Sequence, residues 1–573
     1  MKRYFIFIFL AGYALIMSAT VKPRNGRGTA QSEQTTPEEE SGQGNGARKI
    51  GSQQTAPLKA QGSPKVPVIL VQFSDLKFTS GLGTTIDSEG NEVHNQCVTT
   101  DDEKTVNDFF TLFCNGTGNE GSYYTEGGSY GAIREYFRDQ SDGQFTPEFV
   151  VIGPVTLKNG YAYYGKNSST SKDTNVSAFY KEAITNAQEI FDDWSQFDND
   201  GNKSVDMAFF IFAGEGENGG GGANTIWPHE RQSGGTLNNV TFGCYACCNE
   251  TYKGETDGIG VFVHELSHAM GLPDFYDTKY IAYGLDYYDI MDSGCYCDNA
   301  YTPCNYSAYQ RDFMGWQSLV TLDPSESQGL TLYPISKGGL GYKIVNPENS
   351  NEYLILENRQ ASGWDQYLGR GTERTKMHGL LVTRVNYNAS SWKNNAVNTN
   401  ASSQRITIVP ADHTLRSYMW VNDYDDYNDF MISAIGDMFP GSGDVSSLSG
   451  THEVIYKYNE LIIEEKEGVD PETGETIMVK ESYKEEHSYD WSTSDFGQPI
   501  TNIAEHEDGT ITLDFNADIT AISNLFENRK EGLSIYNMMG VVVGKTDLEY
   551  GRPTSLPKVP GIYVVNGRKF VVR

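Results

Sequence analysis

The chain has 573 residues, which predicts roughly three to four domains and ample length for a buried core. Its 44 Lys and Arg residues against 76 Asp and Glu residues give a net charge of −32. Such a surface repels phosphate backbones, which argues against a nucleic-acid partner and suits an exported protein or one that binds cations. The 60 glycines and the 12% of aromatic residues favour β-structure and long ordered loops over a helical bundle.

The first 19 residues have the pattern of a signal peptide. Residues 1–3 are Met-Lys-Arg, residues 4–17 are mainly apolar, and Ser18 and Ala19 are small residues suited to cleavage. An uncleaved membrane anchor is the alternative, but the apolar run is short for a helix that crosses a bilayer. We therefore expect a secreted protein, extracellular or associated with the cell surface, with no integral membrane segment in the mature chain.

Residues 20–62 are polar and lack an apolar period, which predicts a disordered segment or a short propeptide. From 63 to 320, amphipathic helices alternate with apolar strands, and this mixture predicts an α+β domain. The expected helices are Asp101–Phe113, Gly131–Arg138, Ser177–Trp194, Asp257–Met270 and Ser307–Trp316, and the expected strands are Val66–Phe73, Gln144–Leu157 and Val205–Phe212.

After residue 320 the helical periodicity nearly vanishes, and short alternating segments predict a β-sandwich module over 321–518. Its expected strands are Gly329–Tyr333, Tyr353–Glu357, Gly379–Val385, Arg405–Val409, Glu453–Lys457 and Thr510–Phe515. Two further segments, Leu533–Asn537 and Gly561–Gly567, predict a small C-terminal β-domain over 519–573.

The eight cysteines are an even number, which favours disulfide bonds in an exported protein. The Cys-x-x-Cys pair Cys244 and Cys247 is an alternative zinc ligand pair. A site with four thiolates needs a second matched pair, however, and Cys295 and Cys297 have the wrong spacing. We therefore predict disulfides, with a connectivity that the sequence does not determine.

The strongest chemical signal is the segment from His264 to Asp274. A His-Glu-x-x-His pattern puts His264 and His268 one helical turn apart on one face, where a single zinc ion can bridge them. Glu265 lies beside the first ligand, where a carboxylate can take a proton from the attacking water. Gly271 ends the helix, so that Asp274 can return towards the metal as a third ligand. A chance match is disfavoured, because the helix is otherwise apolar and buried unpaired polar groups are costly.

Met291 follows about twenty residues later, within Tyr288–Gly294. A methionine in a tight turn after an extended zinc motif resembles the metzincin arrangement, in which it forms an apolar floor beneath the metal. The alternative is that Met291 is ordinary core filler.

The chain resembles the immune-inhibitor-A family of secreted zinc metalloproteases, relatives of the metzincins. The resemblance covers roughly 63–515 and is carried by the zinc motif and by Ser129–Phe137, Gly143–Phe145, Tyr161–Gly165, Ile226–His229, Ser307–Trp316, Leu356–Gln360 and Gly363–Asp365. It implies a twisted sheet with a backing helix and an active-site helix, zinc bound by His264, His268 and Asp274, and Glu265 as the general base. Asp277 lies close in sequence and remains an alternative third ligand.

A second cluster of oxygen side chains predicts a calcium site, because calcium takes six to eight hard oxygen ligands. Its expected ligands are Asp198, Asp200, Asn202, Asp206 and the backbone carbonyl of Ser204. The spacing is similar to an EF-hand loop, but glycine falls at the fourth position and Phe209 replaces the closing glutamate. The alternative is a solvated acidic turn.

We expect the strand Asp206–Phe212 to border the cleft and to bind extended peptides by β-augmentation. The glycine-rich run Gly214–Gly222 lacks the Gly-Lys-Ser/Thr of a phosphate loop and is interpreted as a flexible rim. His229 is interpreted as structural.

These observations predict a secreted zinc endopeptidase that acts on proteins or peptides. The alternative is a catalytically inactive adhesin or carbohydrate-binding protein on a metalloprotease scaffold, but such a scaffold would be free to lose Glu265. Other zincin-type hydrolases are a minor alternative. The C-terminal segment, with Ile535–Gly540, Gly561–Tyr563 and Lys569–Arg573, resembles the sorting domains of type IX secretion substrates, which implies contact with a secretion machinery. The alternative is a small β-domain with no export role.

Overall fold

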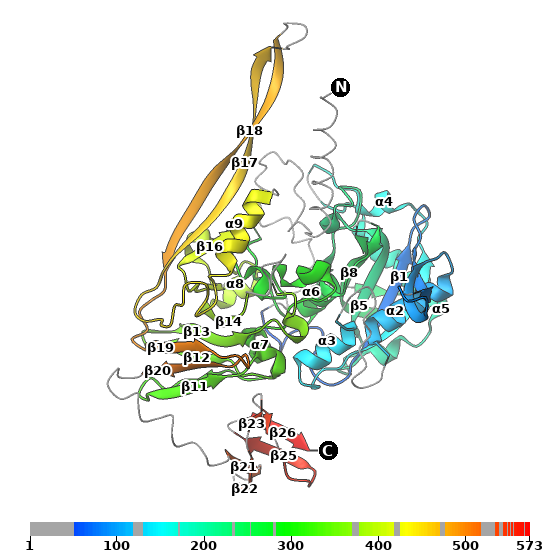
Figure 1. Ribbon diagram of the computed structural model, residues 1–573. Coiled ribbons are helices and arrows are strands. Elements are labelled where there is room, and N and C mark those ends of the chain that lie inside the picture. Colours follow the sequence, from blue (N-terminus) through cyan, green and yellow to red (C-terminus); the bar gives the residue numbers. More distant parts are fainter. Residues whose placement is uncertain are drawn as a thin grey trace.

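The computed structural model of the chain describes residues 51–86, 88–117, 130–169, 172–231, 235–252, 254–278, 282–368, 377–417, 424–469, 476–516, 533–537, 542–546, 548–549, 552–553, 555–565 and 568–572 (Figure 1). The predicted signal peptide and residues 20–50 lie outside the described residues. Across the described part, no helix has the length and apolar character needed to span a bilayer.

A mixed sheet forms the centre of the N-terminal half, in the order β4-β1-β5-β8-β6. Its strands are β1 (Lys65–Gln72), β4 (Glu148–Thr156), β5 (Val205–Glu215), β8 (Val240–Tyr252) and β6 (His229–Arg231), and β7 (Gly235–Leu237) and β9 (Glu255–Thr256) also pair with β8. The first four strands are parallel, and β6 is antiparallel to β8.

Successive side chains of β1 point to opposite faces of this sheet, so that a continuous apolar run is buried on both sides. Val68 and Leu70 belong to one core cluster, and Ile69 and Val71 belong to another. This arrangement explains why the strand reads as uninterrupted apolar sequence.

Helices cover both faces of the sheet, and the five predicted helices are present within a few residues of their expected ends. They are α2 (Glu103–Asn115), α3 (Ile133–Gln140), α5 (Val176–Ile190), α6 (Gly260–Ala269) and α7 (Ala308–Phe313). A further short helix, α4 (Tyr161–Gly165), precedes α5. The apolar side of α5 packs in the cluster on one face, whereas α2, α3 and α6 pack in the cluster on the other.

The strand Asp206–Phe212 was expected to bind extended peptides by β-augmentation, which needs a free sheet edge, but it does not lie at an edge. The strand β5 lies between β1 and β8, and all its residues from Val205 to Ala213 are buried. The antiparallel strand β6 takes the edge position instead. It lies close to α6, the helix with the zinc motif.

The C-terminal half contains two sheets that share an apolar cluster. The five-stranded sheet consists of β10 (Val320–Thr321), β12 (Tyr342–Asn346), β13 (Asn349–Arg359), β14 (Gly379–Asn386) and β15 (Ile406–Ile408), and the three-stranded sheet consists of β11 (Gln328–Leu332), β20 (Ile511–Phe515) and β19 (Ile500–Glu505). Two helices, α8 (Ala389–Lys393) and α9 (Tyr424–Ala434), were not expected from the sequence.

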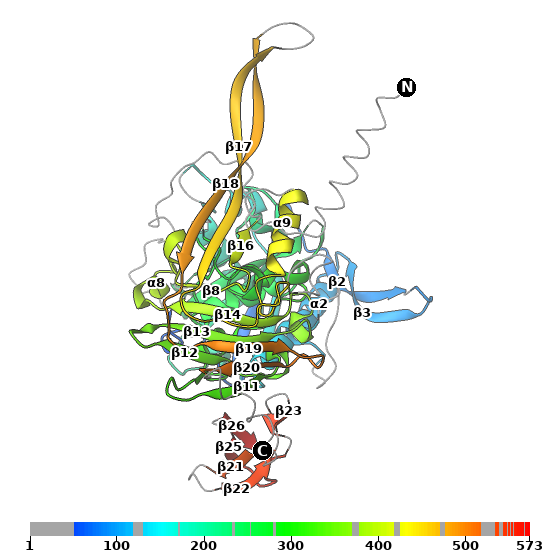
Figure 2. The same ribbon diagram turned by 60° about the vertical axis from the view of Figure 1, so that its left-hand side comes forward.

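Two hairpins project from the body of the molecule (Figure 2). One pairs β2 (Ser80–Ile86) with β3 (Glu92–Thr99), and the longer one pairs β17 (Glu453–Val469) with β18 (Thr476–Ser492) next to β16 (Thr414–Ser417). The expected strand Glu453–Lys457 is only the base of this long hairpin.

The two halves of the chain, before and after residue 320, share part of their apolar interior. A single apolar cluster includes Phe262 of α6, Ile355 of β13, Leu381 of β14 and Tyr456 of β17. The two halves therefore bury a common interior, although they differ in their elements.

The described residues before 63 are also part of this body, so the predicted disordered segment ends earlier than expected. Leu58 and Ala60 are fully buried in the same cluster. The backbone nitrogen of Leu58 donates to the carbonyl of Ala269, and the indole of Trp316 donates to the carbonyl of Ala60.

The described C-terminal residues form a separate four-stranded sheet in the order β22-β21-β25-β26. Its strands are β21 (Leu533–Asn537), β22 (Val542–Thr546), β25 (Gly561–Val565) and β26 (Arg568–Val572), with a small pair of β23 (Leu548–Glu549) and β24 (Arg552–Pro553) beside it. Ile535, Tyr563 and Val565 form its own apolar cluster.

The prediction of disulfide bonds is wrong. All eight cysteines lie in the described ranges, and the structure forms no disulfide between them. Cys244, Cys247 and Cys248 are buried on β8, where they serve as small apolar side chains, and burial raises the pKa of the Cys247 and Cys248 thiols well above the usual range.

We expect a thiol count on the purified protein, denatured without reductant, to find eight reactive thiols per chain. The native protein should react much more slowly, because every cysteine except Cys97 is buried and the thiolate is the reactive form. A count of six or fewer in fresh protein would mean that disulfides form.

Candidate active site

The helix α6 places the two predicted histidine ligands at the centre of the molecule. All ten of its residues are buried. Gly260 begins the helix, and a Cβ at this position would collide with the carbonyl oxygen of Cys295. The glycine therefore lets the start of the helix approach the segment that follows the methionine turn. At the other end, Gly271 has a φ of +102°, a left-handed conformation that stops the helix and turns the chain back.

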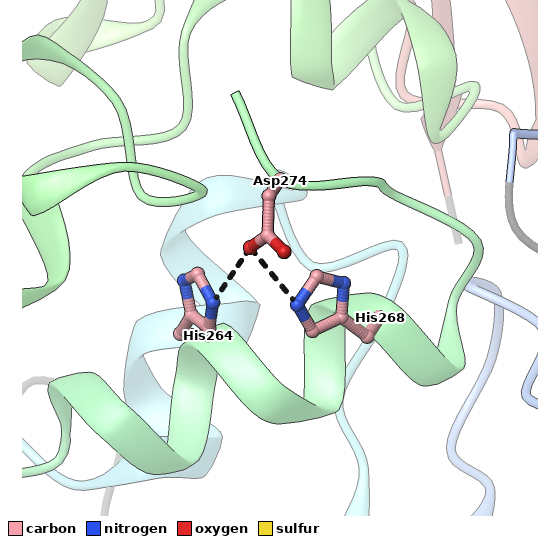
Figure 3. Close-up of side chains that lie close together, drawn as sticks. All are labelled: His264, His268 and Asp274. Carbon is pink, nitrogen blue, oxygen red and sulfur yellow. Dashed lines mark ion pairs between the residues drawn. The ribbon is translucent and has the colours of Figure 1, made fainter. Parts of the chain in front are cut away.

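The chain returns so that Asp274 faces both histidines (Figure 3). Its Oδ1 atom lies 3.2 Å from Nε2 of His264 and 3.2 Å from Nε2 of His268. Zinc bonds of about 2.0–2.2 Å in a tetrahedron place neighbouring ligand atoms roughly 3.3 Å apart. Asp274 Oδ1 therefore already has the spacing of a fellow zinc ligand from each imidazole nitrogen, and the ligand atoms of all three residues lie within 4.8 Å of one another.

Both imidazoles are oriented by hydrogen bonds from the opposite side of their rings. Nδ1 of His264 lies 2.9 Å from the carbonyl oxygen of Ile290, and Nδ1 of His268 lies 2.7 Å from the carbonyl oxygen of Leu272. A carbonyl oxygen can only accept, so each Nδ1 carries the proton. In a neutral ring, the Nε2 lone pair then points towards Asp274, as a metal ligand requires.

The electrostatic properties of His264, His268 and Asp274 also favour a bound cation between them. Burial alone would raise the pKa of the Asp274 carboxyl, but the charge of His268 and the closeness of both imidazoles hold that pKa well below its usual range. Burial would lower the pKa of His268, yet Asp274 raises it to about 10. The buried Oδ1 of Asp274 accepts no hydrogen bond of ordinary geometry. A positive charge between the three side chains would satisfy this oxygen.

The alternative third ligand, Asp277, lies elsewhere. His264, His268 and Asp274 bring one ligand atom each within 4.8 Å of one another, and Asp277 is not part of any such group in the described residues. Its carboxylate accepts a hydrogen bond of 2.8 Å from the backbone nitrogen of Ala282. Asp277 is buried, which fits a role in holding this loop.

Glu265 lies in the wall of a pocket beside the histidines. The pocket is lined by Asn218, Trp227, Pro228, Val261, His264, Glu265, Tyr276, Asp292, Ser293, Cys295 and Tyr296. Burial raises the pKa of the Glu265 carboxyl from its ordinary value. No hydrogen bond or ion pair occupies this carboxylate within the described ranges, so its oxygens are available to a molecule in the pocket.

The comparisons with known proteins agree with this geometry. Residues 53–318 match the family model of the immune inhibitor A peptidase M6 catalytic domain. Immune inhibitor A of Bacillus thuringiensis subsp. alesti is 26% identical over 298 residues, which covers 45% of this chain and 41% of the relative. Pre-pro-metalloprotease PrtV of Vibrio cholerae serotype O1 (strain M66-2) is 28% identical over 219 residues, which covers 33% of this chain and 24% of the relative.

Residues 53–318 are therefore similar to a peptidase M6 catalytic domain, and over that part the chain is similar to metalloproteases. It spans less than half of the length of each of these relatives. The matched region begins at residue 53, ten residues before the predicted start of the domain, in agreement with the packing of Leu58 and Ala60.

The turn that contains Met291 is held rigidly next to the histidines. Met291 is fully buried, and its carbonyl accepts from the backbone nitrogen of Phe275. Asp289 accepts hydrogen bonds from the Met291 backbone nitrogen, from Gln310 and from Ser307. Burial raises the pKa of Asp289 to about 7. This turn therefore fixes the carbonyl of Ile290 that orients His264.

The glycine-rich rim is more ordered than expected. Asn218 and Gly219 are buried, and Asn218 lines the pocket together with Trp227. Nδ1 of His229, on the edge strand β6, donates to the Trp227 carbonyl oxygen at 2.7 Å, and Nε2 shares a hydrogen bond of 3.1 Å with the Tyr245 hydroxyl. Burial lowers the pKa of His229. These contacts agree with its interpretation as a structural residue.

The predicted calcium loop brings three carboxylates together. Asp198, Asp200 and Asp206 each place an oxygen within 4.8 Å of the others. Asp206 is 5% exposed, and its Oδ1 atom has no hydrogen-bond partner, whereas Asn199 donates to its Oδ2. Asn202 directs its amide nitrogen towards Asp200, and its oxygen accepts from the Ser204 backbone. The calcium prediction is not tested by these contacts.

The sequence did not indicate two groups of residues at this site. Trp227 and Tyr296 lie in the pocket wall, but the sequence assigned neither of them a place at the site, although Trp227 belongs to Ile226–His229, one of the segments that carry the family resemblance. Asn395 contacts Asp274 from a position 121 residues away in the chain. The resemblance of Ile226–His229 to the family was the signal that could have found Trp227, and no local signal marks Asn395.

Proposed function

We propose that the chain is a secreted zinc endopeptidase that hydrolyses peptide bonds in proteins. The observation that carries the proposal is the convergence of His264, His268 and Asp274 with a neighbouring carboxylate, Glu265, in the wall of a pocket. The match to the peptidase M6 catalytic domain supports the same activity. We also retain the metzincin-like arrangement and Met291 as the methionine of its turn as parts of this proposal.

The residues fit a zinc ion in number, chemistry and spacing, because two neutral imidazoles and one carboxylate are a ligand set that leaves one position open. When bound there, zinc would supply Lewis acidity towards water and towards the scissile carbonyl. The ordered hydrogen bonds of both imidazoles would hold the site in place before substrate arrives.

Glu265 accepts the proton of the attacking water and returns it to the leaving amine nitrogen. The burial of Glu265 favours this cycle, because it raises the pKa of the carboxyl. A carboxylate with a raised pKa accepts the water's proton more readily, and the protonated side chain can hold that proton until the amine leaves. The edge strand β6 lies next to α6 and is antiparallel to β8, so an extended peptide can pair with its outer side. No covalent enzyme intermediate is needed.

The test is hydrolysis of an unfolded protein by the purified full-length chain. We expect activity that disappears in a chelator selective for zinc and returns when zinc is added. Binding to proteins or glycans without any cleavage, in protein that contains stoichiometric zinc, would instead favour the inactive adhesin.

We further propose that Asp198, Asp200, Asn202, the Ser204 carbonyl and Asp206 bind calcium. The orphaned, buried oxygen of Asp206 beside two other carboxylates supports this proposal. Without a cation these carboxylates repel one another, and burial raises the pKa of Asp206 to about 6 with Asp200 and Asp198 adding to the rise.

Calcium should raise the melting temperature of the zinc-loaded protein, because a ligand that binds only the folded state stabilises it by mass action. Asp200→Ala should remove most of this dependence and leave the zinc content unchanged. The neighbouring Asp193→Ala, outside the cluster, is the matched control. An unchanged melting temperature between chelated and millimolar calcium would favour a solvated acidic turn.

Export is also a proposal. The signal-peptide pattern of residues 1–19 and the small C-terminal sheet support secretion, with the C-terminal residues addressing a type IX machinery. Deletion of the C-terminal β-domain should then retain the protein inside the cell while the remaining chain stays folded.

A further inference from the structure

The two carboxylate oxygens of Asp274 have different surroundings. Oδ1 faces both histidines, whereas Oδ2 accepts a hydrogen bond of 2.6 Å from the side-chain nitrogen of Asn395. The backbone nitrogen of Asp274 donates to the side-chain oxygen of Asn395 at 2.7 Å. A single amide group therefore holds Asp274 at two points, and it leaves only Oδ1 directed towards the histidines.

Asn395 belongs to the C-terminal half of the chain, in the loop after α8. It has a φ of +52°, which asparagine tolerates better than most residues. The loop is anchored on both sides. Trp392 is fully buried and its indole donates to the Tyr309 hydroxyl, and Asn398 donates to the carbonyls of Phe275 and Ile406. The position of Asn395 is thus set by contacts with both halves of the chain, because Tyr309 and Phe275 lie before residue 320 and Ile406 lies after it.

Asp274 needs such support more than the other two ligands do. His264 and His268 lie on a helix, and carbonyl oxygens fix their rings. Asp274 lies beyond the helix, in a segment without regular secondary structure. Outer contacts that orient a ligand typically contribute about 10- to 100-fold to metal affinity.

We propose that Asn395 is a positioning residue that presents Asp274 to the metal, so that the β-rich half of the chain completes a metal centre whose ligands all lie in the protease half. This proposal rests on the proposed zinc function. It predicts a role for Asn395 in metal affinity that goes beyond fastening one loop to another.

Asn398 provides the comparison that separates these two roles. It lies three residues away, is fully buried, and fastens the same loop to the residue after Asp274 through the Phe275 carbonyl. Within the described part of the chain, its side chain bonds to backbone groups of Phe275, Arg405 and Ile406 and to none of the three proposed metal ligands. Asn398→Ala therefore removes hydrogen bonds that hold the loop. It leaves in place the two hydrogen bonds between the Asn395 amide and Asp274, which we call the amide clamp.

The test compares two changes at Asn395. Asn395→Gly removes the clamp without strain, since glycine accepts a positive φ. Asn395→Asp keeps an acceptor for the Asp274 backbone nitrogen but places a second carboxylate against Oδ2. The full-length variants are titrated with zinc in competition with a chelator, and the melting temperature of each metal-free protein is measured separately.

We expect Asn395→Gly to weaken zinc affinity by about 10- to 100-fold and Asn395→Asp to weaken it further. Neither should lower the metal-free melting temperature as much as Asn398→Ala, which should keep its zinc affinity. Unchanged affinity in Asn395→Gly would overturn the positioning role, as would equal losses of affinity in the Asn395 and Asn398 variants. If the wild-type protein cleaves substrate with zinc while Asn395→Gly binds zinc normally, only this inference fails. If the wild type holds no zinc, the proposed function fails and the inference falls with it.

Discussion

Replacing Glu265 with glutamine should leave zinc bound and lower peptide hydrolysis by about 10²- to 10⁴-fold. Gln has nearly the same shape as Glu, but its amide cannot accept the proton of the attacking water. Glu265 lies in the wall of the pocket and is not among the three converging ligands, so the metal should stay in place. The measurement is kcat on a peptide substrate at saturating zinc, together with the zinc content of the same sample.

Glu189→Gln is the matched control, because it makes the same chemical change on the exposed side of α5, behind the sheet. It should retain full activity. Turnover near the wild-type level in zinc-loaded Glu265→Gln would exclude Glu265 as the general base. If the variant lost its zinc as well as its activity, Glu265 would instead be needed to bind the metal.

Local periodicity explains how much of the fold could be predicted. The strand β1 and the helices α5 and α6 carry their patterns within a few turns of chain, and each appears close to its expected position. The two histidines of α6 follow from the same argument, since a spacing of four residues places them on one helical face. Because the rest of this buried helix is mainly apolar, the two histidines were best explained as metal ligands.

Interactions between distant segments could not be predicted in this way. The even number of eight cysteines suggested disulfides, whereas the central sheet simply buries the three cysteines of β8 as small apolar side chains. Each of the two strands in the hairpin of β17 and β18 has 17 residues, in which charged residues are interspersed with apolar ones. Such a charged segment is typical of a solvated surface, and only pairing between the two strands turns it into a ribbon.

The edge of the central sheet illustrates the same limit. The strand β5 was expected to pair with extended peptides, which needs a free edge, but its residues are buried on both faces and it pairs with two neighbours. The actual edge strand β6 has only three residues. A segment that short carries no periodicity, so its place follows from its pairing with β8 alone.

The third ligand provides the second large effect that we expect. Asp274→Asn should reduce the zinc content from about one ion per chain to a small fraction. Asparagine is neutral, and its orientation is also wrong for a metal. Asn395 donates a hydrogen bond at the Oδ2 position, so the new side chain should turn its oxygen there and point its amide nitrogen at the histidines. That nitrogen has no lone pair to offer a cation.

Asp277→Asn is the matched comparison, because Asp277 is also buried and an asparagine there can still accept from the Ala282 backbone nitrogen. This variant should keep its zinc and most of its activity. Zinc content is measured by elemental analysis after dialysis, and the melting temperature of the metal-free proteins shows whether both variants fold. Loss of zinc from Asp277→Asn with retention in Asp274→Asn would move the third ligand to Asp277. Equal retention in both would mean that two histidines suffice, which the 3.2 Å approach of Asp274 to each imidazole argues against.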